Sequence, residues 1–234
     1  MEKAGERNGS NPGKEKGSGA RGPDPYLQER FRMVETQIRA RGIRDPRVLE
    51  AMVRVPRERF LPTEFRDLAF KDSPISIGSG QTISQPYIVA LMTELLQLTG
   101  KERVLEVGTG SGYQCAILAE LAKEVFTVEI VPELASRARK ILENLGYRNI
   151  HYRIGSGFEP WPGEAPFDRI ILTAAPPSLP QSLLEQCKIG GRIVAPVGVG
   201  QQWLMVYDRL KDGSFRRTKV IPVRFVPMVP ETRP

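Results

Sequence analysis

The chain has 234 residues, of which 40% are hydrophobic, and a formal net charge of +7 at pH 7. This length is enough for one large domain with a full core, or for two small ones. Lysines and arginines are scattered among acids, with modest clusters at 30–47 and 216–219, so we interpret them as solvated faces rather than a nucleic-acid groove. No apolar run resembles a signal peptide or reaches membrane-spanning length, and we expect a soluble, cytoplasmic protein without a membrane partner.

Residues 1–25 form a distinct first segment, rich in Gly, Ser, Lys, Glu and Pro and almost without large apolar side chains. This composition cannot bury enough surface to offset its ordering entropy, which predicts a disordered tail. Apolar residues then recur at helical spacing from Leu27 to Ile38, which predicts a helix over 26–40 that ends at Gly42.

The stretch up to residue 98 combines short helices with loops. Asp45 is a good helix cap and Pro46 fits a first helical turn, which predicts a second helix that ends at residue 53. The further expected elements are an extended or turn-like segment at 55–62, a loop with a short strand at 72–85, and an apolar helix at 86–98.

Strands alternate with helices from residue 103 to residue 197, which predicts βαβ units and a parallel sheet covered on both faces. Two later strand-like runs joined by Asp212-Gly213 predict a C-terminal antiparallel hairpin. We therefore expect an α/β fold with extra N-terminal helices. The expected strands are 103–107, 125–130, 150–154, 167–173, 192–197, 203–210 and 215–225, and the expected helices are 113–122, 132–145 and 179–187.

The residues that often carry metals or disulfides are few. Cys115 lies in an expected apolar helix and Cys187 near the end of a later one, so both are interpreted as small core residues rather than a disulfide. His151 is the single histidine, opens an expected strand and is interpreted as structural. Without a Cys/His cluster we expect no metal site.

Residues 104–113 hold the most informative motif, in which an apolar run ends in an acid and three glycines follow at alternate positions. A tight glycine turn between a buried strand and a helix is a nucleotide cradle. The dinucleotide fingerprint has its third glycine one residue later, where this chain has Tyr113. Glu106 also suits a cationic ligand better than pyrophosphate. Both features indicate S-adenosylmethionine, which carries a sulfonium and an ammonium group and no phosphate. The contacts expected here are Glu106, Gly108, Thr109, Gly110 and Gly112.

Two further positions complete the expected cofactor site. Glu129 ends the second strand, where a carboxylate accepts hydrogen bonds from both ribose hydroxyls of an adenosine, and Ile130 would lie against the adenine face. After the third strand, Ser156, followed by Gly157, would contact the adenine amino group, more weakly than an acid would.

A second constellation lies at 78–86, where hydroxyls precede a helix N-terminus. Free backbone N–H groups and the helix dipole favour an anion there, so these residues form a receptor of carboxylate size. The alternative is that Ser84 or Thr82 merely caps the helix. A Ser-His-Asp hydrolase is disfavoured, because the chain has no G-x-S-x-G elbow and His151 is the single candidate base.

These residues resemble the protein-L-isoaspartate O-methyltransferase family in its bacterial and archaeal form, over about residues 28–230. The glycine motif is shared by many methyltransferases, whereas its combination with the preceding Thr-Ile-Ser-Gln-Pro segment is far more specific. The resemblance rests on VPRERF at 55–60, GQTISQPY at 80–87, LEVGTGSGY at 105–113, APFDRII at 165–171 with TAAP at 173–176, and VRFVP at 223–227.

The resemblance implies an activity. A methyl group moves from S-adenosylmethionine to the free α-carboxylate of an L-isoaspartyl residue, or to a D-aspartyl residue, in a damaged protein, and the ester then collapses to a succinimide without enzyme help. It also implies a Rossmann-like methyltransferase sheet in a single domain over 26–234, whose part 26–98 holds the substrate loop and whose part 99–234 is the cofactor-binding core. We expect a monomer.

The resemblance also implies roles for single residues. Ser84 would be the catalytic residue, on a loop that closes over cofactor and substrate. Thr82, Gln85 and Val226 would join it in binding the substrate, and Thr82 also in binding the cofactor. The family usually carries Gly-Asp-Gly after the third strand, where this chain has Gly-Ser-Gly at 155–157, so its adenine contact departs from the family pattern.

Two other functions are compatible with the residues taken alone. One is a different methyltransferase, acting on a small molecule or on RNA, to which the charge of +7 gives some weight. The other is a protein that senses S-adenosylmethionine or damaged chains without turnover.

Overall fold

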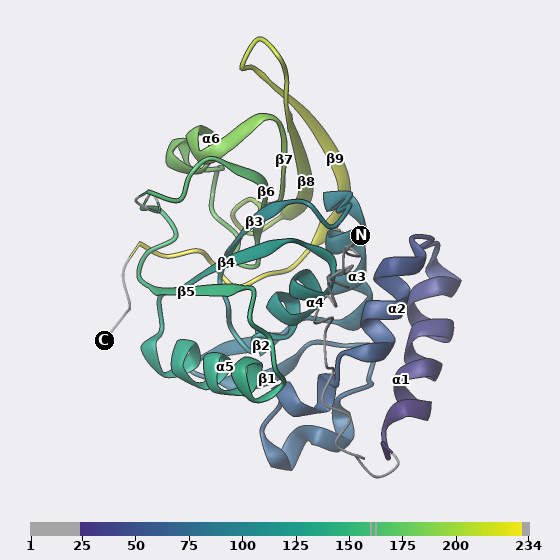
Figure 1. The fold of residues 1–234 in the computed structure, drawn as a ribbon. Coiled ribbons are helices and arrows are strands. Elements are labelled where there is room, and N and C mark those ends of the chain that lie inside the picture. The colour runs from purple at the N-terminus through teal and green to yellow at the C-terminus, as the bar shows by residue number, and fades with distance from the viewer. Residues whose placement is uncertain (1–23, 160, 162, 231–234) are drawn as a thin grey trace, which may run out of the picture.

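The central sheet has seven strands in the order β5-β4-β3-β6-β7-β8-β9 (Figure 1). In this computed structural model, which describes residues 24–159, 161 and 163–230, the strands from β5 to β7 run parallel, and β8 and β9 join antiparallel to β7. The expected parallel sheet with a C-terminal hairpin is confirmed. The strands are β3 Arg103–Val107, β4 Glu124–Glu129, β5 Ile150–Ile154, β6 Phe167–Leu172, β7 Cys187–Val197, β8 Gln202–Arg209 and β9 Phe215–Val223.

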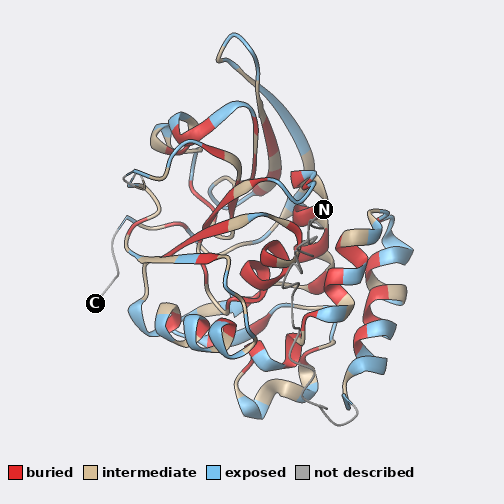
Figure 2. Ribbon diagram, in the orientation of Figure 1, coloured by how far each residue is buried: buried red, intermediate tan, exposed pale blue. Residues whose placement is uncertain are grey.

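Two apolar clusters pack against the two faces of the sheet, because neighbouring residues of a strand point to opposite sides. Val104 belongs to the cluster that includes α3 and α4, whereas Leu105 belongs to the cluster under α6. Helix α4 is buried along nearly its whole length, while α5 alternates buried and exposed positions (Figure 2). The helices of the sheet region are α3 Pro86–Leu96, α4 Tyr113–Leu121, α5 Pro132–Asn144 and α6 Gln181–Gln186.

The N-terminal part adds helices beside α3 and α4 (Figure 1). The predicted first helix is present, although its second half widens into a π-helix and tightens into a 3-10 turn before it ends at Gly42. The Asp45 side chain accepts a hydrogen bond from the Arg47 N–H at 2.9 Å, which confirms the predicted cap. The elements are α1 Leu27–Met33, η1 Val34–Ile38, η2 Arg39–Arg41, α2 Pro46–Arg54, η3 Arg57–Phe60 and η4 Thr63–Leu68.

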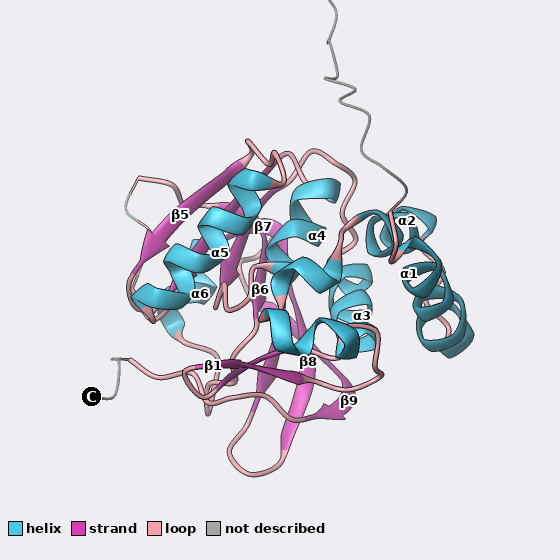
Figure 3. Ribbon diagram, turned by 90° about the horizontal axis from the view of Figure 1, so that it is seen from below, coloured by secondary structure: helices cyan, strands magenta, loops and turns pink. Residues whose placement is uncertain are grey.

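The predicted loop at 72–85 is a two-stranded hairpin, formed by β1 Ile75–Gly78 and β2 Gln81–Ile83. Viewed from below, the hairpin lies on the near side of the molecule (Figure 3). Arg137 of α5 donates a hydrogen bond to the Ile77 carbonyl at 3.3 Å. A Cβ added at Gly110 would lie 4.0 Å from the Ile77 side chain, so the hairpin packs close to the glycine turn.

The segment 55–62, predicted to be extended or turn-like, contains the short 3-10 helix η3, which agrees with the turn-like form. One predicted boundary is wrong. The helix predicted over 179–187 is shorter, and Cys187 begins β7, because its backbone already pairs with Phe167 of β6. Gly191 lies inside that strand, where the chain passes so close to Cys187 and Asp168 that a side chain would not fit.

The cysteines and the histidine match their predicted structural roles. Cys115 and Cys187 are buried free thiols. His151 is exposed, its ring stacks on Phe126 with centroids 4.4 Å apart, and its Nε2 lies 3.2 Å from Glu124 Oε1. Among residues 24–159, 161 and 163–230, no helix is long and apolar enough to cross a membrane, and no three His, Cys, Asp or Glu side chains gather to hold a metal. The predicted tail lies outside the described residues up to residue 23, and Asp24 pairs with the buried Arg30.

Candidate active site

A cavity of about 380 Å³ lies at the carboxyl ends of β3, β4 and β6. The chain passes from β3 outward through β4 and β5 and then returns to β6 on the other side of β3, so the cavity occupies the switch point of the sheet, where α/β folds bind ligands. Its size is within the range of small-molecule sites. The wall comes from 81–85, the first turn of α3, the glycine turn 107–111, residues 128–130, 155, 157 and 173–174, and the C-terminal segment 222–229.

The glycine turn is held in place by its two neighbouring strands. Gly108 has a φ of 100°, and a Cβ there would overlap Thr173 Oγ1, so only glycine lets the turn lie against the end of β6. Thr173 Oγ1 donates to the Val107 carbonyl at 3.0 Å. Gly110 donates its N–H to Glu129 Oε2 at 2.7 Å. Gly108, Thr109 and Gly110 all line the cavity, as expected for a ligand cradle.

Gly112 does not line the cavity, although it was expected among the cofactor contacts. It is the N-cap of α4, with a φ of 87°. A Cβ there would lie 3.2 Å from the Ala138 Cβ and 3.3 Å from Leu142 Cδ1, both of α5. The third glycine therefore lets α4 pack closely against α5 and contributes to the site only indirectly.

Glu129 lines the cavity and also organises its floor. Its Oε2 accepts the Gly110 N–H, and its Oε1 accepts the N–H groups of Ile130 at 2.9 Å and Val131 at 3.0 Å. A carboxylate oxygen has two lone pairs, so Oε2 can accept one further hydrogen bond, as the expected ribose contact requires. Ile130 lines the cavity beside it.

Glu106 is fully buried and does not line the cavity, so the expected direct contact with a cation is absent. Its Oε2 accepts the Thr127 hydroxyl at 2.6 Å, and Thr127 Oγ1 lies 2.6 Å from Thr109 Oγ1. Because the Thr127 proton points to Glu106, Thr109 donates its hydroxyl proton to Thr127 in this arrangement. Glu106 thus reaches the cavity through two threonines, and its Oε1 has no partner among the described residues.

We expect cofactor binding near pH 7 to release a proton from Glu106. Burial raises the pKa of this carboxyl to about 8, so in the cofactor-free protein it holds a proton at neutral pH. The positive charges of S-adenosylmethionine favour the ionised form and lower that pKa, so affinity should rise with pH up to about 8. Calorimetry at pH 7 in buffers of different ionisation enthalpy measures the proton. Glu106→Gln should release none, and equal release from both proteins would contradict the expectation.

Ser156 is buried behind the cavity rather than in its wall, which Gly155 and Gly157 form. Its hydroxyl accepts the Phe158 N–H at 3.3 Å. A Cβ at Gly157 would overlap Val107 Cγ1, so this loop lies directly on the end of β3. The structure therefore does not bring the Ser156 hydroxyl to the position expected for an adenine contact.

Ser156→Asp is expected to tighten cofactor binding. One carboxylate oxygen can keep the Phe158 N–H, and the longer side chain carries the second oxygen toward the cavity as an acceptor for the adenine amino group. A hydrogen bond to a charged group corresponds here to about 1–2 kcal/mol, or roughly 5- to 30-fold in affinity. Calorimetry with S-adenosylmethionine measures the change, and equal or weaker binding would refute it.

The substrate-side residues Thr82, Ser84 and Gln85 line the same cavity. Gln85, and not Ser84, is the N-cap of α3, and no side chain caps that helix, so the interpretation of Ser84 or Thr82 as a mere cap is wrong. The Gln85 amide donates to Asp72 Oδ1 at 2.8 Å. The Ser84 hydroxyl makes no hydrogen bond with the described part of the chain and is available to a ligand.

The C-terminal segment contributes Val226, whose carbonyl accepts the Ala175 N–H at 2.8 Å. Sequence reasoning missed Arg224, which lines the cavity and pairs with no acid among the described residues. An anionic substrate in this cavity would be attracted by this cation. Arg224 does lie in the VRFVP motif at 223–227, which supports the family resemblance. Neither residue spacing nor composition indicated that the segment after the last strand reaches the cavity.

The comparisons with known proteins agree on one family. The model of the Protein-L-isoaspartate(D-aspartate) O-methyltransferase family matches residues 28–233. The chain is 56% identical over 206 residues to the protein-L-isoaspartate O-methyltransferase of Picosynechococcus sp., covering 88% of this chain and 92% of the relative. It is 57% identical over 194 residues to protein-L-isoaspartate O-methyltransferase 1 of Anaeromyxobacter sp., covering 82% of this chain and 92% of the relative.

Solved structures agree on the fold. A protein-L-isoaspartate O-methyltransferase superposes with a TM-score of 0.75 and 25% identity over 86% of this chain, and this chain spans 65% of the length of that one. A structure from Plasmodium falciparum in complex with S-adenosyl-L-homocysteine has a TM-score of 0.75 and 22% identity, and covers 86% of this chain and 99% of that one.

Sheet order and the cavity at its switch point define the class of protein, an S-adenosylmethionine-dependent methyltransferase of Rossmann-like fold. Within that class, the chain belongs to the protein-L-isoaspartate(D-aspartate) O-methyltransferase family. The family expected from the sequence motifs is thereby confirmed.

Proposed function

We propose that this chain transfers a methyl group from S-adenosylmethionine to the free carboxylate of damaged residues in proteins, which is the α-carboxylate of L-isoaspartyl residues and the β-carboxylate of D-aspartyl residues, with Ser84 as the residue that orients the carboxylate. The observation that carries the role of Ser84 is its unpartnered hydroxyl in the wall of the cavity that also holds the glycine turn. The family membership carries the reaction.

The residues around the cavity fit S-adenosylmethionine. Thr109 lines the cavity and is linked through Thr127 to the buried Glu106 carboxyl, whose ionised form would favour a cationic group nearby. Glu129 keeps a free lone pair for a ribose hydroxyl, and Ile130 offers an apolar surface for adenine. Gly110 opens to the cavity without a side chain to block it.

Methyl transfer to a carboxylate requires no proton transfer by the protein. Bound S-adenosylmethionine supplies an electrophilic methyl group. A free α-carboxyl has a pKa of about 3.3–3.7 and is ionised at neutral pH, so no general base is needed. The protein has to align the carboxylate with the methyl group and exclude water.

The groups of this chain are suited to that alignment. The Ser84 hydroxyl donates a hydrogen bond to one oxygen of the substrate carboxylate, and Arg224 adds a positive charge at the same cavity. Thr82 and Gln85 flank Ser84, and Val226 bounds the site from the C-terminal segment. The β1–β2 hairpin brings Ile77 close to the glycine turn, so that a Cβ added at Gly110 would lie 4.0 Å from its side chain.

Transfer of labelled methyl to an isoaspartyl peptide tests the proposal, with the aspartyl twin of that peptide as control and total RNA as a third acceptor. We expect label on the isoaspartyl peptide alone. Equal labelling of both peptides would refute the substrate assignment, and label on RNA would favour the alternative methyltransferase. Cofactor binding without any product would favour a sensing protein.

The proposal includes a cytoplasmic setting and a monomer that works without a nucleic-acid partner. The two buried free thiols, Cys115 and Cys187, suit a reducing compartment. Sedimentation of the purified protein at working concentration checks the monomer.

A further inference from the structure

Arg57 is a fully buried cation that the proposed reaction does not use directly. It is the first residue of η3 and lies in the VPRERF motif at 55–60. Within the described part of the chain, no acid pairs with Arg57 and its Nη1 has no hydrogen-bond acceptor. Burial lowers its pKa to about 10. Because burying a cation without a carboxylate is costly, a purely structural position would favour an apolar side chain.

The guanidinium bridges two segments that are distant in sequence. Its Nε donates to the Ala69 carbonyl at 2.7 Å, and its Nη2 donates to the Ser84 carbonyl at 2.7 Å. It also lies over the Tyr113 ring, 4.7 Å from the centroid. Arg57 therefore contacts both the backbone of Ser84 and the first residue after the glycine turn.

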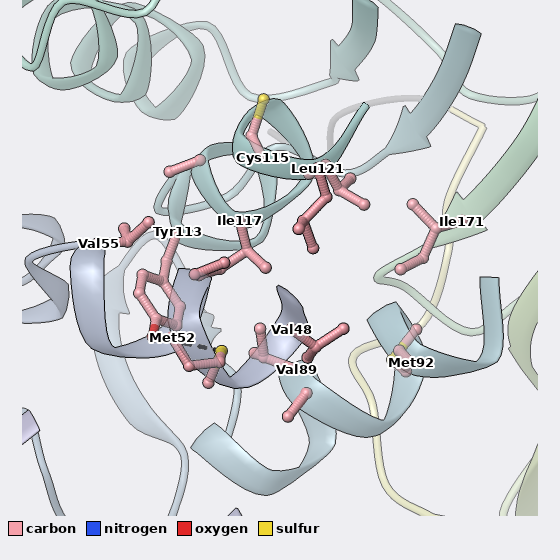
Figure 4. Packing of buried hydrophobic residues seen from close by; sticks show 14 of the residues in the cluster. Val48, Met52, Val55, Val89, Met92, Tyr113, Cys115, Ile117, Leu121 and Ile171 are labelled. Carbon is pink, nitrogen blue, oxygen red and sulfur yellow. Dashed lines mark hydrogen bonds between the residues drawn. The ribbon is translucent and has the colours of Figure 1, made fainter. Parts of the chain in front are cut away.

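Tyr113 is a fixed reference point for that contact. It is the first residue of α4 and is buried between the N-terminal helices and α4 (Figure 4). Its hydroxyl donates to Met52 Sδ at 3.7 Å, and its ring packs against Phe60 with centroids 5.5 Å apart. A guanidinium stacked on this ring is fixed relative to the glycine turn.

Ser84, in contrast, lies in the two-residue link between β2 and α3. Strand β2 ends at Ile83 and α3 begins at Pro86, so Ser84 belongs to neither hydrogen-bonded element. Its carbonyl accepts from Arg57 alone among the described residues. Removing this bond would free the Ser84 backbone to turn, and the direction of its hydroxyl would turn with it.

We propose that Arg57 is a positioning residue for methyl transfer, whose guanidinium fixes the backbone of Ser84 relative to the glycine turn and so aims the Ser84 hydroxyl at the substrate carboxylate. The inference rests on the proposed role of Ser84. A lysine at position 57 keeps the charge but replaces the rigid fork by one mobile ammonium group, which cannot hold both carbonyls in the same geometry.

A double-mutant cycle separates this role from a structural one. The four proteins are the parent, Arg57→Lys, Ser84→Ala and the double variant, all assayed for kcat with an isoaspartyl peptide. We expect Arg57→Lys to lower kcat by about tenfold in the parent, since misplacing a reacting group by 1 Å can cost on the order of 100-fold. In the Ser84→Ala background the same substitution should change kcat by less than about twofold, because the hydroxyl that it misplaces is gone.

Arg30→Lys is the matched control. Arg30 is also a buried arginine of the N-terminal helices, but it bonds to Glu58 and to the Val53 carbonyl, neither of which lines the cavity. The Arg30→Lys variant should lower the melting temperature as Arg57→Lys does. It should leave kcat unchanged at a temperature where all variants are folded. Arg57→Gln is carried through the same cycle, so the result does not depend on the folding of one variant.

The outcomes are distinct. Equal slowing by the Arg57 substitutions in both backgrounds would show that Arg57 acts independently of Ser84 and would overturn the inference, while leaving the role of Ser84 intact. An unchanged kcat for Ser84→Ala alone would overturn the role of Ser84 and the inference together. An equal loss of activity in Arg30→Lys and Arg57→Lys would show that the effect of Arg57 comes from general destabilisation of the N-terminal helices, and would overturn the inference.

Discussion

Ser84→Ala should lower the turnover of an isoaspartyl peptide by about 10- to 100-fold, because a hydrogen bond to a charged group corresponds to about 1.5–3 kcal/mol. The substrate carboxylate then binds with one oxygen unsupported and samples orientations that are not in line with the methyl group. The substitution leaves no buried partner unsatisfied in the free protein, since the Ser84 hydroxyl bonds to no described residue. The loss therefore appears in catalysis rather than in stability.

Three measurements isolate that effect. Turnover and KM come from methyl transfer to the peptide, cofactor affinity from calorimetry, and stability from thermal unfolding. Ser76→Ala is the matched control, because Ser76 is an exposed serine of the preceding β1–β2 hairpin that does not line the cavity. Ser76→Ala should behave as the parent does. A Ser84→Ala protein with parental turnover would remove Ser84 from the mechanism.

The fold was predictable because its signals are local and periodic. Each central strand is a short apolar run bounded by turn residues, and the parallel order follows from the alternation with helices. The boundary that failed depends on a partner distant in sequence. Cys187 reads as the end of a helix, but pairing with Phe167 draws it into β7. The hairpin within 72–85 is likewise defined by its own pairing rather than by composition.

The site residues that could be predicted are those that lie at or just after the end of a strand. Glu129 and the first two glycines follow strand ends, and the ends of adjacent parallel strands meet at one edge of the sheet. Glu106 shows the limit of that reasoning. It lies one residue before the end of β3, but its side chain does not line the cavity and is linked to it only through Thr127 and Thr109. No spacing rule reveals a relay between side chains of two strands.

Arg57 shows a second limit. The motif at 55–60 supports the family, yet nothing in the sequence indicates what its arginine does. Its partners are two backbone carbonyls, at Ala69 and Ser84, and backbone carbonyls leave no mark on composition or periodicity. Such a role becomes visible only when the chain is folded.

Glu129→Gln should weaken S-adenosylmethionine binding by about 10- to 100-fold, since hydrogen bonds to a charged group are worth about 1.5–3 kcal/mol. In the parent, both carboxylate oxygens accept backbone N–H groups, from Gly110 on one side and from Ile130 and Val131 on the other. The amide of glutamine must turn its NH₂ group toward one of these donors, which leaves two donors facing each other. If the NH₂ group faces Gly110, it displaces the glycine turn. If it faces Ile130 and Val131, the ribose meets an amide oxygen, which is a weaker acceptor than a carboxylate oxygen.

Calorimetric titration with S-adenosylmethionine measures the loss, and Glu133→Gln provides the control. Glu133 is exposed in the first turn of α5, close in sequence to Glu129, and does not line the cavity. It removes the same charge at the surface and should leave affinity within about twofold of the parent, because exposed charges contribute little. Equal weakening by both substitutions would mean that Glu129 acts as a distant charge, and parental affinity in Glu129→Gln would remove it from the cofactor site. We expect a loss of cofactor affinity in Glu129→Gln alone, because three backbone N–H groups donate to the Glu129 carboxylate and none of the three can pair with an amide NH₂ group.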